Sequence, residues 1–374
     1  MKKTAAILLA LTVVLGLSAC GSDGPVAPPS APPQQSIIES PTTEHDTAPS
    51  EPVEEILPWS WPTDTPENQG LNQAVLDTVH ATFDTFPLLS SVIVKNGYLI
   101  DTYCKDGYAD QVFVLNSASK SITSALIGIA IDQGYIEDVT VPLSDYFPQV
   151  LEFDDTAWQQ ITIWHLLTHT SGILTTDDSN WEAWRSADNW IDYILELPIV
   201  STPGTEFSYS TGNTHLLSAI LEQATGMSMY EFGREYLFDP VGMDSVQIGT
   251  DPQGIADGGN GIWLSTSDMA KFGALFLNGG SWEGQQVVPA DWVEQSTSVQ
   301  FQRSTGSADY GYQWWVRTFG DLQYDAFFAQ GHGGQYIFVV PQLELVVAIN
   351  SDYEGPTGIY WQIMNDLVNA CEAA

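Results

Sequence analysis

Basic residues are scarce in this sequence, which has 10 lysines and arginines against 47 aspartates and glutamates, a formal net charge of −37. Nucleic acids and anionic membrane surfaces need clustered Lys and Arg, so both are excluded as main partners. The sequence also lacks a Gly-x-Ser-x-Gly elbow, a Cys-x-x-Cys pair and a phosphate-binding glycine loop. His165 and His169 have the spacing of a metal pair but lack the glutamate of His-Glu-x-x-His, which predicts structural roles. No metal, nucleotide or other cofactor is predicted.

Cysteine is rare too, with only Cys20, Cys104 and Cys371. The segment MKKTAAILLALTVVLGLSAC has a charged start, a short apolar core and an end that resembles a bacterial lipobox. It predicts a lipoprotein signal peptide over residues 1–19 and lipidation of Cys20. The alternative is an uncleaved anchor, although the apolar run is shorter than the roughly 20 residues of a spanning helix. Cys104 and Cys371 either pair in an oxidising compartment or remain buried free thiols.

Residues 20–58 are rich in proline and acidic residues and contain no lysine or arginine, which predicts an extended, disordered tether. Residues 59–374 show no second linker and are predicted to form one large unit with two lobes around a shared core. We therefore expect a monomer in the bacterial cell envelope, lipid-anchored outside the cytoplasm. The lipid is its only predicted contact with the membrane.

The order of the expected elements predicts the fold class. A hairpin with an Asn96-Gly97 turn comes first, helices fill the middle, and strands return before a closing helix. This order favours an α/β (α+β) fold whose antiparallel sheet is built from both chain ends and flanked by helices, with a mostly helical inserted lobe. The expected elements are a hairpin over 91–104, helices over 117–133, within 161–172, over 213–226 and over 357–369, and up to three strands within 324–350.

Ser117 and Lys120, in FVLNSASKSITSALIG, form the only Ser-x-x-Lys of the chain. At the start of a helix, residues three apart share a face. A buried lysine has a lowered pKa and can take the proton of a serine hydroxyl. The alternative is that Ser117 or Asn116 is only a helix N-cap.

Two further segments contain candidate residues. Tyr209, in PGTEFSYSTGNTHLL, precedes a helix, where an aromatic side chain is usually part of the core. In GHGGQYIFVV, His332, Gly333, Gly334 and Gln335 open a strand at which a free backbone amide could bind an oxyanion. The alternative for this second segment is an ordinary glycine turn.

Together and in this order, these pieces resemble the penicillin-recognising serine hydrolases, a superfamily that includes serine β-lactamases and penicillin-binding proteins. The nearest branch comprises class C β-lactamases, D-alanyl-D-alanine carboxypeptidases, family VIII carboxylesterases and 6-aminohexanoate-dimer (nylon-oligomer) hydrolases. ITIWHLLTHTSG, LFDPVGM and GIWLSTSDMAKFG are also typical of it. The resemblance implies a β-lactamase/transpeptidase-like fold and an acyl-enzyme formed on Ser117. Lys120 would be its proton partner and Tyr209 the base, as phenolate or within a shared proton network, and the amides of Ser117 and Gln335 would form the oxyanion hole.

The chain departs from this branch at two positions. Thr211 stands where the Tyr-x-Asn motif has asparagine, and Asn213, two residues further along, is a second candidate for that role. His332, with Gly333 and Gly334, occupies the place of the Lys-Thr-Gly box, whose positive charge matches a substrate carboxylate. A histidine is mostly neutral near pH 7. We therefore expect a serine hydrolase of the esterase or amidase type, acting on a neutral or cationic ester or amide.

Two alternatives to this expectation stay open at this point. The first is a class C-like β-lactamase or D-alanyl-D-alanine carboxypeptidase. The second is a non-catalytic lipoprotein that binds the cell wall or another ligand.

Overall fold

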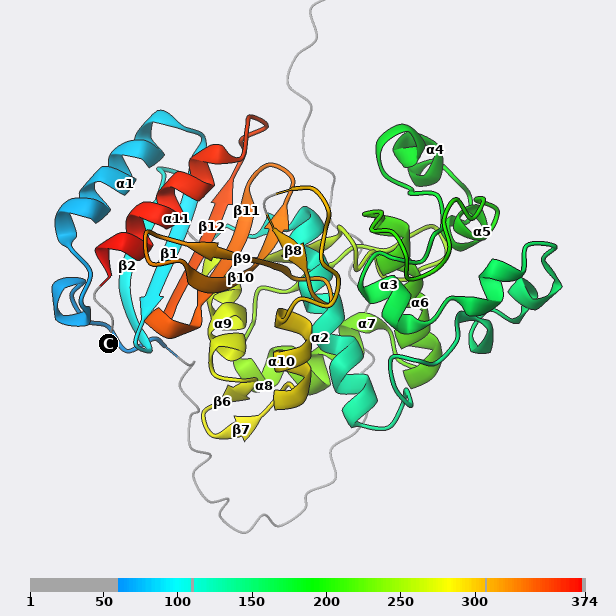
Figure 1. Ribbon diagram of the computed structural model, residues 1–374. Helices are drawn as coiled ribbons and strands as arrows, with labels where there is room; N and C mark the ends of the chain where they lie inside the picture. The colour runs from blue at the N-terminus through cyan, green and yellow to red at the C-terminus, as the bar shows by residue number, and fades with distance from the viewer. Residues whose placement is uncertain (1–59, 109–110, 307, 372–374) are drawn as a thin grey trace, which may run out of the picture. The chain divides into compact units, whose positions relative to one another are not determined.

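The computed structural model describes residues 60–108, 111–306 and 308–371 of the chain. Its main sheet has seven antiparallel strands in the order β2-β1-β12-β11-β10-β9-β8 (Figure 1). The first hairpin thus lies beside the last strand, which confirms the prediction of a sheet made from both ends of the chain. The strands are β1 (Leu88–Lys95), β2 (Tyr98–Cys104), β8 (Asp309–Tyr310), β9 (Trp315–Phe319), β10 (Tyr324–Gly331), β11 (Gln335–Val340) and β12 (Leu345–Ser351).

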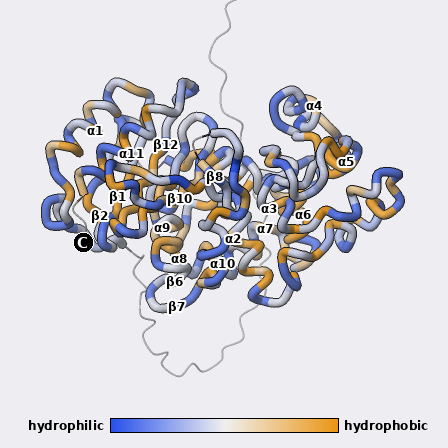
Figure 2. The backbone as a smooth tube through the Cα atoms, viewed as in Figure 1, coloured by the Kyte–Doolittle hydropathy of each residue, from blue (hydrophilic) through white to orange (hydrophobic). Residues whose placement is uncertain are grey.

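Helices cover both faces of this sheet. On one face, α1 (Gln73–Thr85) packs beside α11 (Gly358–Ala370); on the other, α9 (Thr266–Leu277) contacts β12, β11 and β1. Along β12, Leu345 and Val347 belong to the core under α1 and α11, whereas Val346 belongs to the core on the opposite face. This alternation follows the two-residue period of a strand. Figure 2 shows hydrophobic residues concentrated in the strands and in α9.

The segment between β2 and β8 supplies the mostly helical insertion. Its central helix α2 is buried from Ser119 to Ala130 and packs against α6 and β10, so it joins the helical part to the sheet. Besides α9, the insertion contains α2 (Ser119–Asp132), α3 (Ile163–Leu167), α4 (Trp181–Arg185), α5 (Trp190–Leu195), α6 (Thr211–Thr225), α7 (Met229–Gly233), α8 (Asp239–Val241), α10 (Ala290–Thr297), β3 (Phe113–Val114), β4 (Gln247–Ile248), β5 (Ile262–Leu264), β6 (Ser281–Trp282) and β7 (Gln285–Gln286).

The turn signals of the sequence are mostly confirmed. Asn96 and Gly97 both have positive φ, 51° and 78°, as a tight hairpin turn requires. Gly226, with φ 71°, ends α6. The sequence predicts that the short helix within 161–172 ends at Gly172, and this C-terminal boundary is wrong. The helix ends at Leu167, because the backbone turns to φ 54° at His169.

Cys104 and Cys371 are free, so the disulfide alternative is wrong. Cys104 is the last residue of β2. Cys371 instead forms an isolated backbone β-bridge with Leu71. Leu71 lies near the opposite end of β2, because the neighbouring Gln69 accepts a hydrogen bond from Asn96 in the hairpin turn. A seven-residue strand spans about 20 Å, far more than a disulfide can bridge. Cys104 is also exposed, so only Cys371 is a buried thiol, and burial raises its pKa to about 11.

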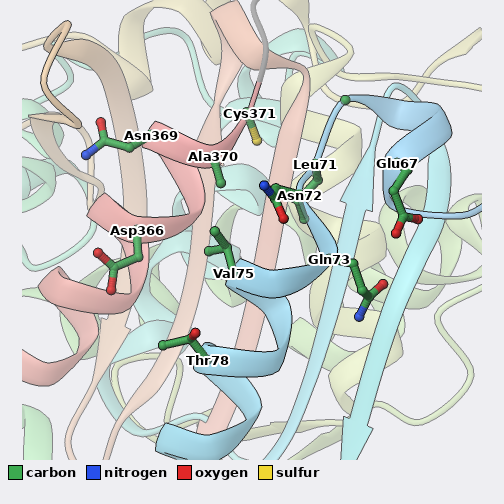
Figure 3. Close-up of a pocket in the computed structure, with 11 residues that line it drawn as sticks. Glu67, Leu71, Asn72, Gln73, Val75, Thr78, Asp366, Asn369, Ala370 and Cys371 are labelled. Carbon is green, nitrogen blue, oxygen red and sulfur yellow. The ribbon is translucent and has the colours of Figure 1, made fainter.

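Cys371 lines a cavity of about 940 Å³ between the start of α1 and the end of α11 (Figure 3). This cavity lies on the α1 and α11 face of the sheet, away from Ser117. Within the described ranges, no helix is long and apolar enough to cross a bilayer. The predicted signal peptide (1–19), the tether (20–58) and Cys20 lie outside the described residues.

Candidate active site

Ser117 lies in a one-turn 3₁₀ helix, Asn116–Ala118, that leads from β3 into α2. Asn116, directly before it, has φ 48°, a left-handed conformation that costs free energy in a residue with a side chain. The Asn116 side chain stabilises this turn by donating to the His332 carbonyl at 2.6 Å and to Gln335 Oε1 at 3.3 Å. The hydrogen bonds of the Asn116 side chain therefore hold the Ser117 turn against the start of β11.

Lys120 is buried in the first turn of α2, three residues after Ser117, and faces it. Its Nζ donates to Ser117 Oγ at 3.2 Å, to Thr211 Oγ1 at 3.1 Å and to the Gly259 carbonyl at 2.7 Å, which accounts for all three donors of an ammonium group. Burial lowers the Lys120 pKa to about 8, and the carboxylates of Asp177 and Asp257 oppose that shift. Only about a tenth of Lys120 is then neutral amine at pH 7, but this fraction is far larger than for an exposed lysine.

Tyr209 comes from the segment before α6 and completes the cluster. Its hydroxyl is hydrogen-bonded to Ser117, and its ring centre lies 4.9 Å from Lys120 Nζ. The ring stacks on Trp315 at 6.0 Å and contacts the buried His169 at 4.6 Å. Burial raises the Tyr209 pKa above its ordinary value, so the side chain is a neutral phenol at physiological pH. The phenolate form is disfavoured here, which leaves the shared proton network.

Asp177 is a site residue that the sequence did not reveal. Its carboxylate accepts from the Thr211 backbone N–H at 2.6 Å and from Thr211 Oγ1 at 2.9 Å, and Thr211 in turn accepts from Lys120. Thr211, which replaces the expected asparagine, thus connects a carboxylate to the lysine. No motif marks Asp177 among the 47 acidic residues, because this contact forms only in the folded chain.

Asn213 does not join Ser117 and Lys120. It is buried two residues further along α6, where its Oδ1 accepts from Ser171 Oγ at 3.0 Å. No hydrogen bond from Asn213 to Ser117 or Lys120 is present among the described residues. Of the two candidates, Thr211 is the one that contacts Lys120.

His332, Gly333, Gly334 and Gln335 form the turn from β10 into β11, close to Ser117. His332 is exposed, whereas the Gln335 side chain is buried and donates to the Ser351 carbonyl at 2.8 Å. Both glycines have left-handed φ, 88° and 94°.

The two glycines differ in their surroundings. A Cβ on Gly334 would lie 1.8 Å from Tyr360 Oη, whereas a Cβ on Gly333 would meet nothing closer than 3.4 Å. Gly334 is thus required by close packing against Tyr360 rather than by an approaching ligand.

The other predicted structural residues take part in packing. His165 Nδ1 lies 3.0 Å from both the backbone N and the Oγ1 of Thr162, and burial lowers the His165 pKa. His169 is fully buried against Tyr209, and its pKa is well below the ordinary value, first because of burial and then because of Lys120. Across the described residues, no cluster of three or more His, Cys, Asp or Glu side chains could hold a metal ion.

Comparisons with known proteins show the family to which the chain belongs. The family model described as Beta-lactamase matches residues 92–361 of the chain. A 6-aminohexanoate-dimer hydrolase of Paenarthrobacter ureafaciens is 26% identical over 312 residues, which cover 75% of this chain and 78% of that protein. Penicillin-binding protein 4 of Amycolatopsis lactamdurans is 24% identical over 302 residues, 69% of this chain and 77% of that one.

Among solved structures, a beta-lactamase from Mycobacterium bovis superposes with a TM-score of 0.59 at 19% identity, covering 79% of this chain and 97% of that chain. At this identity the likeness concerns the fold alone. The predicted β-lactamase/transpeptidase-like fold is confirmed.

Proposed function

Because this chain belongs to the beta-lactamase family of serine hydrolases, we propose that Ser117 forms an acyl-enzyme with an ester or amide substrate. One observation supports this assignment above all: Lys120 Nζ lies 3.2 Å from Ser117 Oγ, and its pKa is lowered to about 8. A nucleophile and a base within hydrogen-bond reach are the minimum for serine catalysis. An N-cap role for Ser117 would not require a buried lysine beside it.

The proton path follows from the two pKa directions. The neutral amine of Lys120 takes the Ser117 proton as Oγ attacks the substrate carbonyl. When the tetrahedral intermediate collapses, the Tyr209 phenol donates its proton to the leaving oxygen or nitrogen and accepts one from the Lys120 ammonium. Water then attacks the acyl carbon while its proton passes to the Lys120 amine, and the second collapse returns a proton to Ser117 Oγ. Each group ends as it began.

The oxyanion of both intermediates requires donors that are fixed before the reaction. We assign this role to the backbone N–H groups of Ser117 and Gln335, which the Asn116 side chain ties together. The strained turn at Asn116 then serves to aim the Ser117 amide. His332, Gly333 and Gly334 would line the site beside this hole, and Thr211 would hold Lys120 in place.

An esterase or amidase activity fits this site better than a strong β-lactamase activity. His332 is exposed, and histidine, unlike lysine, is not a permanent cation, so this turn supplies no permanent positive charge for a β-lactam carboxylate. The relative that hydrolyses a 6-aminohexanoate dimer points in the same direction. The lipobox-like segment supports a lipid-anchored enzyme outside the cytoplasm.

The substrate panel that tests this proposal pairs p-nitrophenyl butyrate with a chromogenic cephalosporin, using the full chain and Ser117→Ala. We expect ester turnover that is lost in Ser117→Ala, with little cephalosporin turnover. Dominant cephalosporin turnover would contradict the argument from His332 and favour the β-lactamase. A folded protein that turns over neither compound would favour a peptidase or a non-catalytic binding protein.

The pH dependence provides a separate prediction. Below about pH 8 Lys120 is mostly an ammonium and cannot accept the Ser117 proton, so kcat/KM should rise with pH through about 8. Asp177 favours the ammonium form, so Asp177→Asn should lower the Lys120 pKa and move the rising limb to lower pH. Profiles of kcat/KM between about pH 5 and 10 measure both effects.

Asp101→Asn is the control. It removes a carboxylate on β2 that pairs with His80, and it should leave the midpoint of the rising limb unchanged. A midpoint that stays fixed or moves upward in Asp177→Asn would exclude Lys120 as the titrating base.

A further inference from the structure

Arg303 lies beside the ring that stacks on Tyr209. It follows α10 in the chain, and its guanidinium carbon is 4.7 Å from the ring centre of Phe207 and 5.1 Å from that of Trp315. Trp315 is nearly parallel to Tyr209, with an interplanar angle of 15°. Arg303 and Tyr209 therefore contact the same aromatic ring, that of Trp315.

Arg303 has no carboxylate partner within 4.0 Å among residues 60–108, 111–306 and 308–371. In contrast, Arg185 pairs with Asp257 at 2.6 Å and Arg234 with Asp239 at 2.7 Å. Arg317, Lys95 and Lys120 have no such partner among the described residues either, so Arg303 is distinguished by its place beside Trp315 and Tyr209 rather than by the missing pair.

The nearby carboxylate of Asp309 binds the backbone of Arg303 rather than its guanidinium group. Asp309 Oδ1 accepts from the Arg303 backbone N–H at 2.8 Å, while Arg303 Nη1 donates to the Ala308 carbonyl at 3.1 Å. A guanidinium has five N–H donors, and stacking on rings occupies its faces rather than the edge that bears them. The half-buried Arg303 side chain therefore keeps donors for an anion.

We propose that Arg303, held against Phe207 and Trp315, binds a carboxylate at the far end of the substrate. This inference rests on the proposed function and specifies its substrate: an ester or amide whose acyl or alcohol part ends in a carboxylate. The fork of a guanidinium matches a carboxylate in a bidentate manner, and the two rings hold the guanidinium in place. This proposal departs from the expectation of neutral or cationic substrates, which was based on His332 and on the acidity of the chain.

The test compares anionic and neutral esters of matched size. The acyl-side pair is p-nitrophenyl hydrogen glutarate and p-nitrophenyl valerate; the alcohol-side pair is p-carboxyphenyl butyrate and p-methylphenyl butyrate. For each pair, the ratio of kcat/KM, anionic over neutral, is measured in the wild-type chain and in Arg303→Gln. Differences in intrinsic reactivity cancel when the ratios of the two proteins are compared.

We expect the ratio to fall by about tenfold or more in Arg303→Gln for one pair, which identifies the side on which the carboxylate lies. Arg317→Gln is the matched control. Arg317 also stacks on two rings, Phe319 at 4.6 Å and Trp361 at 4.9 Å, but these belong to β9 and α11, and both ratios should stay unchanged. Unchanged ratios in Arg303→Gln, with turnover that still depends on Ser117, would overturn the subsite and leave the proposed function intact.

A binding measurement separates the two proposals when turnover is absent. Calorimetric titration of glutarate into Ser117→Ala, and into the same chain with Arg303→Gln added, requires no catalysis. We expect binding about tenfold weaker in the double variant. Equal binding, or no binding to Ser117→Ala, would overturn the role of Arg303 whatever the fate of the proposed function.

Discussion

Lys120→Met is expected to lower kcat/KM for ester hydrolysis by about a thousandfold or more, close to the effect of Ser117→Ala. Methionine keeps the length and the apolar stem of lysine but cannot accept the Ser117 proton. It also leaves Tyr209 as a neutral phenol without its proton donor. Because the nucleophile and its base act as a unit, loss of either should remove nearly the whole catalytic effect.

Folding is not expected to account for that loss. Lys120 is buried without a direct carboxylate contact, so its replacement relieves a desolvation cost even though the Gly259 carbonyl loses a donor. The midpoint of thermal unfolding should therefore remain near that of the wild type. Lys95→Met is the control, since Lys95 is equally buried and donates to the Leu343 carbonyl at 2.9 Å, outside the site. Turnover within tenfold of the wild type in Lys120→Met would instead assign the base to Tyr209.

Gly334→Ala is expected to lower the free energy of unfolding by about 3 kcal/mol or more. The added methyl group would overlap Tyr360 Oη and Ser351 Oγ, which are hydrogen-bonded to each other at 2.5 Å, and the residue would keep a φ of 94°. The neighbouring turn would have to shift, and it leads into Gln335. Denaturant unfolding measures the change, and ester turnover reports the displacement of the predicted oxyanion hole.

Two variants separate the clash from the backbone strain. Gly333→Ala carries the same left-handed strain but no close contact, so it should cost only about 1 kcal/mol. Tyr360→Phe removes the nearest atom and should recover part of the stability in the double variant with Gly334→Ala. Equal losses in Gly333→Ala and Gly334→Ala would mean that φ, rather than packing, dominates.

The sequence predicted those features that depend on neighbours along the chain. The Asn96-Gly97 turn, the stop at Gly226 and the pairing of Ser117 with Lys120 each need only a few consecutive residues. The order of elements was sufficient to predict a sheet from both chain ends. Such local signals do not require knowledge of what packs across the molecule.

The residues that sequence reasoning missed act across long separations. Asp177 reaches Thr211, and Arg303 reaches Phe207, only after loops from different parts of the insertion meet. Neither is part of a short motif, and an aspartate or arginine alone has no preferred position. The predicted end of the helix at Gly172 was wrong for a similar reason. The backbone of His169 has a positive φ, which histidine rarely adopts, and the His169 ring packs against Tyr209 and Tyr310 from distant parts of the chain.

The pairing of β1 with β12, in which Val92 lies opposite Ala348, has a consequence for how the protein forms during synthesis. β1 (Leu88–Lys95) is made long before β12 (Leu345–Ser351), so the centre of the sheet cannot close until the insertion and β12 have both emerged. Until then the β1–β2 hairpin presents an open hydrogen-bonding edge that other chains can pair with. Folding is therefore a late and comparatively slow event governed by distant contacts, and a chain cut short before β12 would leave that edge permanently exposed.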